Sequence, residues 1–352
     1  MVNTSDSDEA SSSLIQHLRS VLPQDGSRDA LITSVIPKLL QSVADVAQAL
    51  RSSHDVAAVG TANTFGDDQL NVDVAAENLI REAIAQCPSI VTASSEEEPI
   101  ERAVQHTVPS STSSAQEQYT LAFDPLDGSS IISANWTVGA IFSLWDGPTA
   151  LHQDPTTGQV AAILGVFGPR TTAIVALRPP NTNTTTTTPP TCFELALSPA
   201  PPSSPSQQPT WQLTRPTLTL SPTSRYFSPA NLRAAAHAPA YMALITRYIA
   251  QRYTLRYAGG LVPDVVHMLV RGEGLYASPA TARDGPKLRR LYELCPLALV
   301  VECAGGAVLD PVGGGRVLER AVGDCGEKGG VVFGGVEAVR EAVEGLVGMG
   351  GL

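Results

Sequence analysis

The second half of the chain alternates between helical and strand patterns, and this alternation restricts the possible folds more than any other feature of the sequence. Some segments repeat apolar residues at helical spacing, whereas others are short apolar runs bounded by glycine or proline. Helices that alternate with strands pack as layers on the faces of sheets, so the sequence predicts an α/β layered architecture. Beyond Tyr226 we expect helices at about 229–252, 262–271, 287–304 and 336–347, and strands at 307–310 and 330–334.

The first half of the chain predicts two helices and four strands. Apolar residues between Asp29 and Leu50 recur at helical spacing, and Pro37 should interrupt or kink this helix. The other expected elements are a helix from Gly66 to about Gln86, a buried strand at Tyr119–Phe123 that ends in a tight turn, and strands at about 137–145, 160–167 and 172–177.

The length of 352 residues exceeds what one hydrophobic core usually serves, so we expect two lobes. In this interpretation residues 1–24 are a disordered tail, 25–220 form an N-terminal lobe, and 221–352 form a C-terminal lobe. Two segments of the first lobe, 181–190 and 199–209, consist mainly of threonine, proline, serine and glutamine. Such segments bury too little apolar surface to offset their ordering entropy, so we predict mobile loops.

The charge and hydropathy of the chain exclude several kinds of partner. With 34 acidic against 23 basic residues, the net charge of −11 argues against a general binder of nucleic acids or anionic membranes. No apolar run reaches the ~18 residues that a membrane span needs. The five cysteines form no CxxC pair, and the N-terminal MVNTSDSDEASSS has neither a signal-peptide nor a transit-peptide pattern. We therefore expect a reduced, cytoplasmic protein whose partners are small molecules.

The charges are distributed unevenly along the chain. Residues 1–127 hold 19 acids and 6 lysines or arginines, whereas residues 247–290 hold 8 lysines or arginines and 3 acids. The first region is suited to binding cations and the second to binding anions.

Three acidic clusters stand out within the first region. They are Asp67, Asp68 and Asp73; Glu96, Glu97 and Glu98; and Asp124 with Asp127. Carboxylate oxygens are the ligands that Mg²⁺ and Mn²⁺ prefer, and these ions also bind phosphate oxygens. Carboxylates this dense repel one another unless a cation lies among them. The alternative is a set of solvated loop charges, which stays open for Glu96–Glu98 taken alone.

The segment DPLDGSS, residues 124–130, carries the strongest signal for a site. Pro125 stiffens the end of an apolar strand, so Asp124 and Asp127 can converge on one ion together with the Leu126 carbonyl. Gly128, Ser129 and Ser130 then offer backbone amides that suit a phosphate. One short segment thus supplies contacts for both a metal ion and an anion, whereas the alternative is a structural aspartate turn.

The sequence resembles the fructose-1,6-bisphosphatase superfamily of metal-dependent sugar phosphatases, and specifically its sedoheptulose-1,7-bisphosphatase branch. The resemblance extends from about residue 25 to 310, and its ordered motifs make a chance match untenable. The motifs are FGDDQLNVD (65–73), SSEEEP (94–99), FDPLDGSSI (123–131), WTVGAIFSLW (136–145), GPRTT (168–172), FSPANLR (227–233), YTLRYAGGLVPDV (253–265) and KLRRLYELCPLALVVECAGG (287–306).

The resemblance implies a layered α/β/α/β/α sugar phosphatase fold of two lobes, with a site between the lobes that holds two or three Mg²⁺ ions; Mn²⁺ is an alternative. Asp67 and Asp73 match two acids of the loop and helix that precede the site in relatives. Asp73 and Glu97 are similar to the pair proposed to deprotonate the attacking water. The residues that match metal ligands are Glu96, Glu97, Asp124, Leu126 through its carbonyl, Asp127 and Glu293.

The resemblance also implies how a sugar bisphosphate binds. One phosphate, the one that is released, lies in the cradle of Gly128, Ser129 and Ser130. The counterpart of Arg256 acts across a subunit boundary in the fructose enzyme, which implies the same role for Arg256. Relatives assemble as dimers or tetramers, so we expect a homo-oligomer. The candidate contacts to the sugar and the second phosphate are Asn231, Arg233, Arg256, Tyr257, Lys287 and Arg289.

Some positions depart from the fructose-type pattern. Ile131 stands where the fructose-type motif has asparagine, and a tyrosine of the fructose enzymes is replaced near Ser278. Both departures favour the sedoheptulose branch. The AMP-binding loop is not recognisable in residues 25–35, and the paired redox cysteines of the chloroplast enzymes have no counterpart before Cys87.

From these observations we predict hydrolysis of the 1-phosphate of sedoheptulose 1,7-bisphosphate by in-line attack of an activated water. The alternatives are a fructose-1,6-bisphosphatase or an enzyme that acts on both sugars, and a catalytically silent relative that only binds sugar phosphates.

Overall fold

The computed structural model describes residues 5–23, 25–62, 68–107, 117–178, 189–198, 209–281 and 283–347. The two segments predicted as mobile loops, 181–190 and 199–209, lie almost entirely outside the described residues. Within these ranges, every helix is too short or too polar to cross a lipid bilayer.

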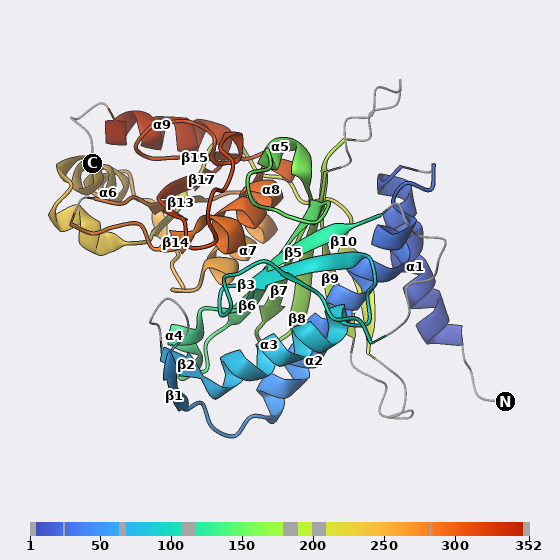
Figure 1. The fold of residues 1–352 in the computed structure, drawn as a ribbon. Coiled ribbons are helices and arrows are strands. Elements are labelled where there is room, and N and C mark those ends of the chain that lie inside the picture. Colours follow the sequence, from blue (N-terminus) through green and yellow to red (C-terminus); the bar gives the residue numbers. More distant parts are fainter. Residues whose placement is uncertain are drawn as a thin grey trace.

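Eight strands form the larger sheet, in the order β10-β9-β8-β7-β6-β5-β3-β4 (Figure 1). Neighbouring strands are antiparallel except for the parallel pair β3 and β5. Every residue of β5, β7 and β8 is buried, as expected for strands whose two faces are both covered. The strands are β3 Ile90–Ser95, β4 Arg102–Ala103, β5 Tyr119–Asp127, β6 Val138–Asp146, β7 Gln159–Phe167, β8 Thr171–Leu177, β9 Thr191–Ser198 and β10 Thr210–Arg215.

Five strands form the smaller sheet, in the order β12-β11-β13-β17-β15. All of them follow residue 225, so the division predicted at residue 220 lies between the two sheets. The strands are β11 Tyr226–Pro229, β12 Thr254–Leu255, β13 Leu275–Ser278, β15 Ala307–Leu309 and β17 Val331–Gly334. Two further strand pairs are β1 Ala58–Ala62 with β2 Asp68–Leu70, and β14 Leu288–Arg289 with β16 Lys328–Gly329.

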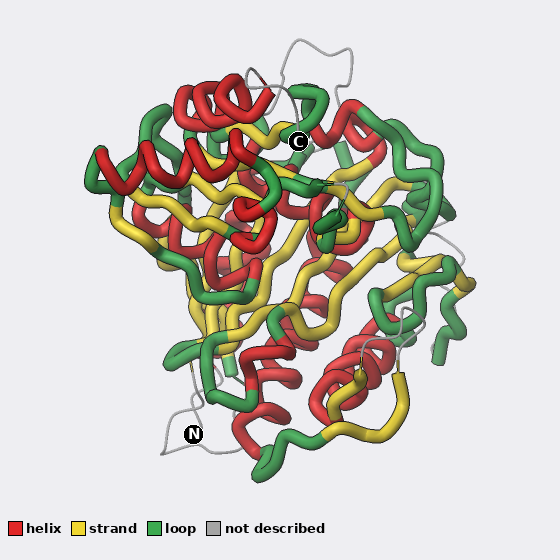
Figure 2. Tube along the Cα trace, turned by 90° about the vertical axis from the view of Figure 1, so that its left-hand side faces the viewer, coloured by secondary structure: helices red, strands yellow, loops and turns green. Residues whose placement is uncertain are grey.

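Helices cover both sheets and fill the space between them, which gives the five layers α/β/α/β/α that the sequence predicts (Figures 1 and 2). The outer layer on the large sheet contains α1 Ser5–Val21, η1 Leu31–Val35, α2 Ile36–Ser52 and α3 Asn71–Ile84; the middle layer contains α7 Leu261–Arg271 and α8 Cys295–Cys303; the outer layer on the small sheet contains α6 Pro239–Ala250 and α9 Val336–Val347. Short turns of helix are α4 Ser129–Ile132, α5 Pro155–Gly158, η2 Leu232–Ala236, η3 Arg290–Leu294 and η4 Val317–Glu319.

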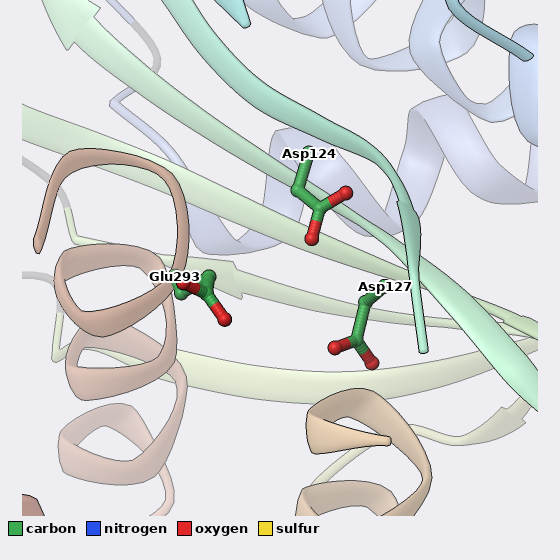
Figure 3. A group of neighbouring side chains, drawn as sticks. All are labelled: Asp124, Asp127 and Glu293. Atoms are coloured by element: carbon green, nitrogen blue, oxygen red, sulfur yellow. The ribbon is translucent and has the colours of Figure 1, made fainter. Parts of the chain in front are cut away.

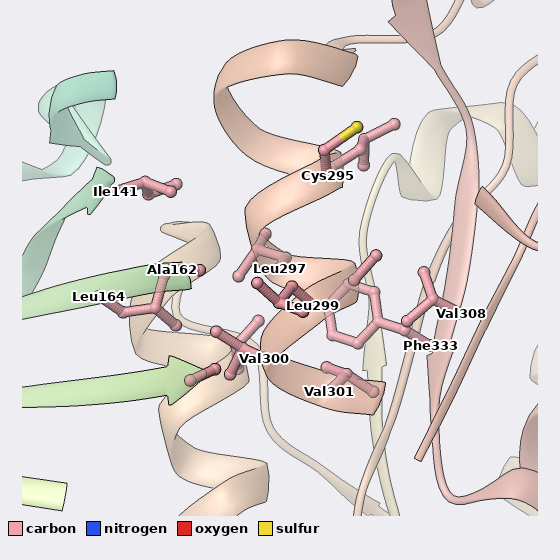
Figure 4. Close-up of a cluster of buried hydrophobic side chains, with 14 of the residues drawn as sticks. Ile141, Ala162, Leu164, Cys295, Leu297, Leu299, Val300, Val301, Val308 and Phe333 are labelled. Carbon is pink, nitrogen blue, oxygen red and sulfur yellow. The ribbon is translucent and has the colours of Figure 1, made fainter. Parts of the chain in front are cut away.

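The middle helix α8 joins the two sheets into one core. Its residues Cys295–Val301 are all buried, so it is apolar on every side, as a helix between two sheets must be. Figure 4 shows Leu297 and Val300 beside Ile141 and Leu164 of the large sheet, with Val308 and Phe333 of the small sheet on the other side. This packing fixes the position of η3, the turn of helix that leads into α8.

Most predicted elements are confirmed, with corrected boundaries. The helix of residues 29–50 is interrupted before Pro37, where the π-helix η1 gives way to α2. The helix expected from Gly66 begins at Asn71 instead, because Asp68–Leu70 pairs with β1 as strand β2. The buried strand of Tyr119–Phe123 continues to Asp127, since the turn starts only at Gly128.

Two helices of the second half are also shorter than predicted. The helix expected at 229–252 divides into η2 and α6, because Asn231 has a left-handed φ of 46° and Pro239 starts a new helix. The helix expected at 287–304 begins at Arg290, since the two preceding residues form strand β14.

The prediction of a disordered tail at residues 1–24 is wrong for the part that the structure describes, residues 5–23. Helix α1 lies against β10, and its residues Leu14 and Leu18, together with Leu22 just after it, are buried in the core of the N-terminal half. These leucines are spaced four residues apart and so share one helix face. The acidic, serine-rich start of the chain concealed this short apolar row.

Leu18→Ala should therefore lower the free energy of unfolding by about 2–5 kcal/mol, because it opens a cavity under α1. Urea denaturation of this variant and of the exposed neighbour Arg19→Ala measures the difference. Equal midpoints for the two variants would show that α1 does not pack as described.

Candidate metal centre

An irregularity in strand β5 places two aspartates on the same face of the large sheet. Asp124 pairs with Ile141 and Asp127 with Gly139, so β5 contains one residue more than β6 between these positions. Residues three apart in a regular strand point to opposite faces, but the additional residue of a bulge restores the same face. Asp124 and Asp127 therefore both point towards the middle helix layer.

Backbone N–H groups hold these aspartates in place. Asp127 accepts hydrogen bonds from the N–H groups of Leu261 (3.1 Å) and Val262 (2.7 Å), the first two residues of α7. The first N–H groups of a helix lack partners within the helix and carry partial positive charge, so they favour an ionised carboxylate. Asp124 accepts the N–H of Leu126 at 3.0 Å.

A third carboxylate reaches the same point from the other half of the chain. Glu293 lies in η3 and accepts the N–H of Arg289 at 2.5 Å. Ligand oxygens of Asp124, Asp127 and Glu293 lie within 4.8 Å of one another, and all three residues are buried. Figure 3 shows the three carboxyl groups directed towards a common space.

Three further carboxylates lie next to this group of three. Glu96 and Glu97 follow strand β3, beside β5; the Glu96 N–H donates to the Phe123 carbonyl (3.0 Å), and Glu97 accepts a hydrogen bond from the side chain of Gln69. Asp73, in the first turn of α3, accepts the N–H of Leu70 at 2.9 Å.

The carboxylates raise one another's pKa. Burial raises the pKa of Asp124 well above its usual range, and Glu96, Asp127 and Glu293 add to the shift. Burial followed by the Glu96 charge raises the pKa of Glu293 in the same way. Burial raises the pKa of Asp127 to about 6 despite its two N–H partners, and the pKa of Asp73 to about 7. Without a counter-charge, this group of acids therefore destabilises the fold at neutral pH.

The donor set fits a divalent ion of the Mg²⁺ type. All candidate ligand atoms are oxygens, which hard divalent cations prefer. Burying several carboxylates together costs free energy, and a cation among them offsets this cost. Of the predicted carboxylates, Asp124, Asp127 and Glu293 form one close group. The charges of Glu96 and Glu97 act on this group or on Asp73, so these three residues lie nearby. The predicted Asp67 lies outside the described residues.

The predicted phosphate cradle follows directly after Asp127. Gly128 has a left-handed φ of 86°, a conformation that favours glycine, and a Cβ atom there would make a tight contact of 3.3 Å with the Gly260 Cα. Ser129 and Ser130 start the short helix α4 at the surface of the site. The close contact places the loop before α7, which carries Arg256 and Tyr257, beside the cradle.

The residues predicted to contact the second phosphate lie in different surroundings. Burial raises the pKa of the Tyr257 hydroxyl, and the charges of Asp264, Arg233 and Asp127 also act on it. Arg256 stacks over the Tyr226 ring at 5.7 Å and lines a cavity of about 650 Å³ with Tyr257. Lys287 is exposed.

Two predicted substrate contacts have protein partners instead. The Arg289 guanidinium forms an ion pair with Glu96 and is 6% exposed, so it lies within the acidic group rather than at a distant phosphate. Its charge offsets part of the carboxylate repulsion there. The side-chain amide of Asn231 donates to the Pro279 carbonyl at 2.7 Å, which ties η2 to the end of β13.

Sequence reasoning missed Asp264, a buried carboxylate in the first turn of α7. It accepts the Ala258 N–H at 2.7 Å, and burial raises its pKa to about 7. Asp264 therefore fixes the loop between Tyr257 and α7. It belongs to the motif YTLRYAGGLVPDV, but no second acid lies near it in the sequence to mark it.

Comparison with known proteins identifies the family of the chain. The family model described as Fructose-1-6-bisphosphatase, N-terminal domain, matches residues 19–188, and the corresponding C-terminal domain model matches residues 220–346. Chloroplastic sedoheptulose-1,7-bisphosphatase of Chlamydomonas reinhardtii is 34% identical over 320 residues, which cover 89% of this chain and 74% of that protein. Class 1 fructose-1,6-bisphosphatase of Geobacter sulfurreducens is 29% identical, covering 84% of both chains.

Solved structures show the same fold. The crystal structure of a candidate sedoheptulose-1,7-bisphosphatase from Toxoplasma gondii has a TM-score of 0.80 and 33% identity, covering 94% of this chain and 97% of that chain. Leishmania major fructose-1,6-bisphosphatase in its holo form has a TM-score of 0.76 at 23% identity, covering 94% and 98% of the two chains.

Asp124→Asn should stabilise the metal-free protein by about 1–2 kcal/mol, because it removes one charge from the acidic group and keeps an oxygen for the Leu126 N–H. When the pKa of an acid is higher in the folded than in the unfolded protein, the free energy of unfolding falls as the pH rises above the pKa of the unfolded state. Asparagine does not ionise, so it avoids this loss of stability. Thermal unfolding in EDTA at neutral pH measures the change, with the exposed Asp29→Asn as control. A lower melting temperature than wild type would contradict the repulsion described here.

Proposed function

The chain belongs to the fructose-1,6-bisphosphatase family of sugar bisphosphatases, and from this premise we propose that it hydrolyses the 1-phosphate of sedoheptulose 1,7-bisphosphate to give sedoheptulose 7-phosphate. The observation that carries the proposal is the group of buried carboxyl groups of Asp124, Asp127 and Glu293, with ligand oxygens within 4.8 Å of one another and a glycine-serine turn directly after Asp127. The preference for the seven-carbon sugar is supported by relatives with that name at 34–36% identity, against 29–30% for the fructose enzymes.

Two or three Mg²⁺ ions would be held at this site, and Mn²⁺ suits the same oxygen ligands. When bound, they supply positive charge that stabilises phosphoryl oxygens and lowers the pKa of a nearby water. The residues that would hold them are Glu96, Glu97, Asp124, Asp127, Glu293 and the carbonyl of Leu126.

The chain's own groups would position the substrate and move the proton. Asp73 is buried beside Glu97, so these two carboxylates can accept the proton of the attacking water. The backbone amides of Gly128, Ser129 and Ser130 would hold the phosphate that is released. Groups that are held by the fold before the substrate binds would need little rearrangement during the reaction.

The second phosphate would bind between the loop before α7 and the neighbouring basic residues. Tyr257 and Arg233 lie on the Asp127 side of this region. We assign Arg256 to the site of a second subunit, since it is exposed and lies on a face where Trp136 is 57% and Tyr257 47% exposed beside the 650 Å³ cavity. A homo-oligomer formed through this face would cover these aromatic side chains.

Asp127→Ala should fold but lose at least about 100-fold in turnover, because both an ion ligand and its alignment with α7 are removed. Phosphate release at saturating Mg²⁺ measures the loss, with the exposed Glu341→Ala on α9 as control. Near-normal turnover of Asp127→Ala would refute the assignment of the site.

Fructose 1,6-bisphosphate is the second candidate substrate, because fructose enzymes are among the relatives. A comparison of kcat/KM for the two bisphosphates should favour the seven-carbon sugar by about 10-fold or more, in the range that a difference of one carbon unit allows. Equal values would indicate an enzyme that acts on both sugars. Absence of Mg²⁺-dependent phosphate release from either sugar would instead indicate a silent relative, although every expected carboxylate in the described part of the chain is present.

A further inference from the structure

Helix α3 presents three charged residues on one face, each four residues from the next. They are Asp73, Glu77 and Arg81. Residues four apart lie above one another on a helix, so Glu77 and Arg81 extend the row that Asp73 begins next to the acidic group. Sequence reasoning assigned no role to Glu77 or Arg81.

Glu77 holds the turn that carries Glu96 and Glu97. Its carboxylate accepts a hydrogen bond from the Ser95 hydroxyl at 2.8 Å. That hydroxyl in turn accepts the N–H of Glu98 at 2.9 Å, and the Ser95 N–H donates to the Glu98 carbonyl at 3.1 Å. Ser95 and Glu98 thus close a four-residue turn with Glu96 and Glu97 at its centre, and Glu77 anchors its closing point to α3.

Arg81 holds the same turn from the side. Its guanidinium binds Glu77 (2.6 Å) and the Glu98 carboxylate (3.0 Å), and it lies over the Phe123 ring at 5.7 Å. Phe123 is the residue before Asp124, and its carbonyl accepts the Glu96 N–H. The turn is therefore fixed to α3 on one side and to the metal-binding strand on the other.

The position of Glu77 costs free energy, because a charged carboxylate is buried there, and an uncharged side chain would avoid this cost. The Glu77 side chain is only 12% exposed, and within the described residues its second oxygen is buried with no hydrogen-bond partner. Its negative charge also lies near that of Glu97, and the ion pair with Arg81 offsets only part of the cost of burial. Burying such a group is costly, so its presence is better explained by a requirement for a fixed geometry than by stability.

We propose that Glu77 is a positioning residue that, through Ser95, fixes Glu97 and Glu96 relative to Asp73, so that metal binding and proton acceptance occur at a preset spacing. The inference rests on the proposed function, because it concerns the same carboxylates. Mutation of a residue that orients metal ligands typically lowers metal affinity or activity by 10–100-fold.

The test compares Glu77→Ala, Ser95→Ala and Glu77→Gln with the control Glu82→Ala, which removes an exposed carboxylate from the same helix. Mn²⁺ binding without substrate is measured by electron paramagnetic resonance, alongside kcat, KM and the melting temperature. We expect Glu77→Ala and Ser95→Ala each to weaken Mn²⁺ binding and lower kcat by about 10-fold or more, with KM for the bisphosphate little changed. The double variant should be no worse than either single one.

Glu77→Gln should keep most of the Mn²⁺ affinity, since its amide oxygen still accepts from Ser95. If Glu77→Ala does not fold, Ser95→Ala decides, because it removes one hydroxyl only. Wild-type Mn²⁺ affinity and kcat in Ser95→Ala and Glu77→Ala, with only a lower melting temperature, would overturn the proposal. A wild-type protein that binds Mn²⁺ but releases no phosphate would contradict the proposed function, while the Mn²⁺ titrations of the variants would still test this inference.

Discussion

Mutual repulsion among buried carboxylates is the constraint on which the rest of this structure depends. Ligand oxygens of Asp124, Asp127 and Glu293 lie within 4.8 Å of one another in a buried environment, where like charges are costly. The fold offsets part of this cost with the first amides of α7 on Asp127 and the Arg289 guanidinium on Glu96. Burial and the neighbouring acids still raise the pKa of Asp124 and Glu293, so a divalent cation between them would offset the remaining repulsion.

The five-layer architecture explains how Asp124 and Glu293, 169 positions apart in the sequence, meet. The end of β5, the start of α7 and the η3 turn before α8 all lie where the large sheet faces the middle helix layer. The bulge in β5 directs both aspartates to that face, and the apolar packing of α8 between the sheets holds Glu293 opposite them (Figures 3 and 4). Apolar packing and the acidic group are thus coupled, because α8 completes the core and follows directly on the turn that carries Glu293, while the start of α7 holds Asp127.

The composition of the site could be predicted from the sequence better than its support. The segment DPLDGSS contains both acidic side chains and free backbone amides, so its role could be predicted from these seven residues alone. The distant Glu293 was predicted only from the resemblance to a family. Contacts such as those of Glu77 and Asp264 could not be predicted, because they depend on which helix faces which turn. Arg289 was expected to bind a phosphate because its charge can be seen in the sequence. Its ion pair with Glu96 could not be predicted, since it also depends on the fold. The packed helix α1 was missed because its leucines follow a polar start.

A crystal structure from crystals grown with Mn²⁺ tests most directly the central claim that the buried carboxylates bind a divalent cation. Anomalous scattering at the manganese edge should give at least one strong peak between the carboxylates of Asp124, Asp127 and Glu293, with oxygen ligands at about 2.2 Å, near the distances typical of hard divalent ions. A well-ordered crystal at saturating Mn²⁺ with no peak between these side chains, or with peaks only elsewhere on the molecule, would contradict the account.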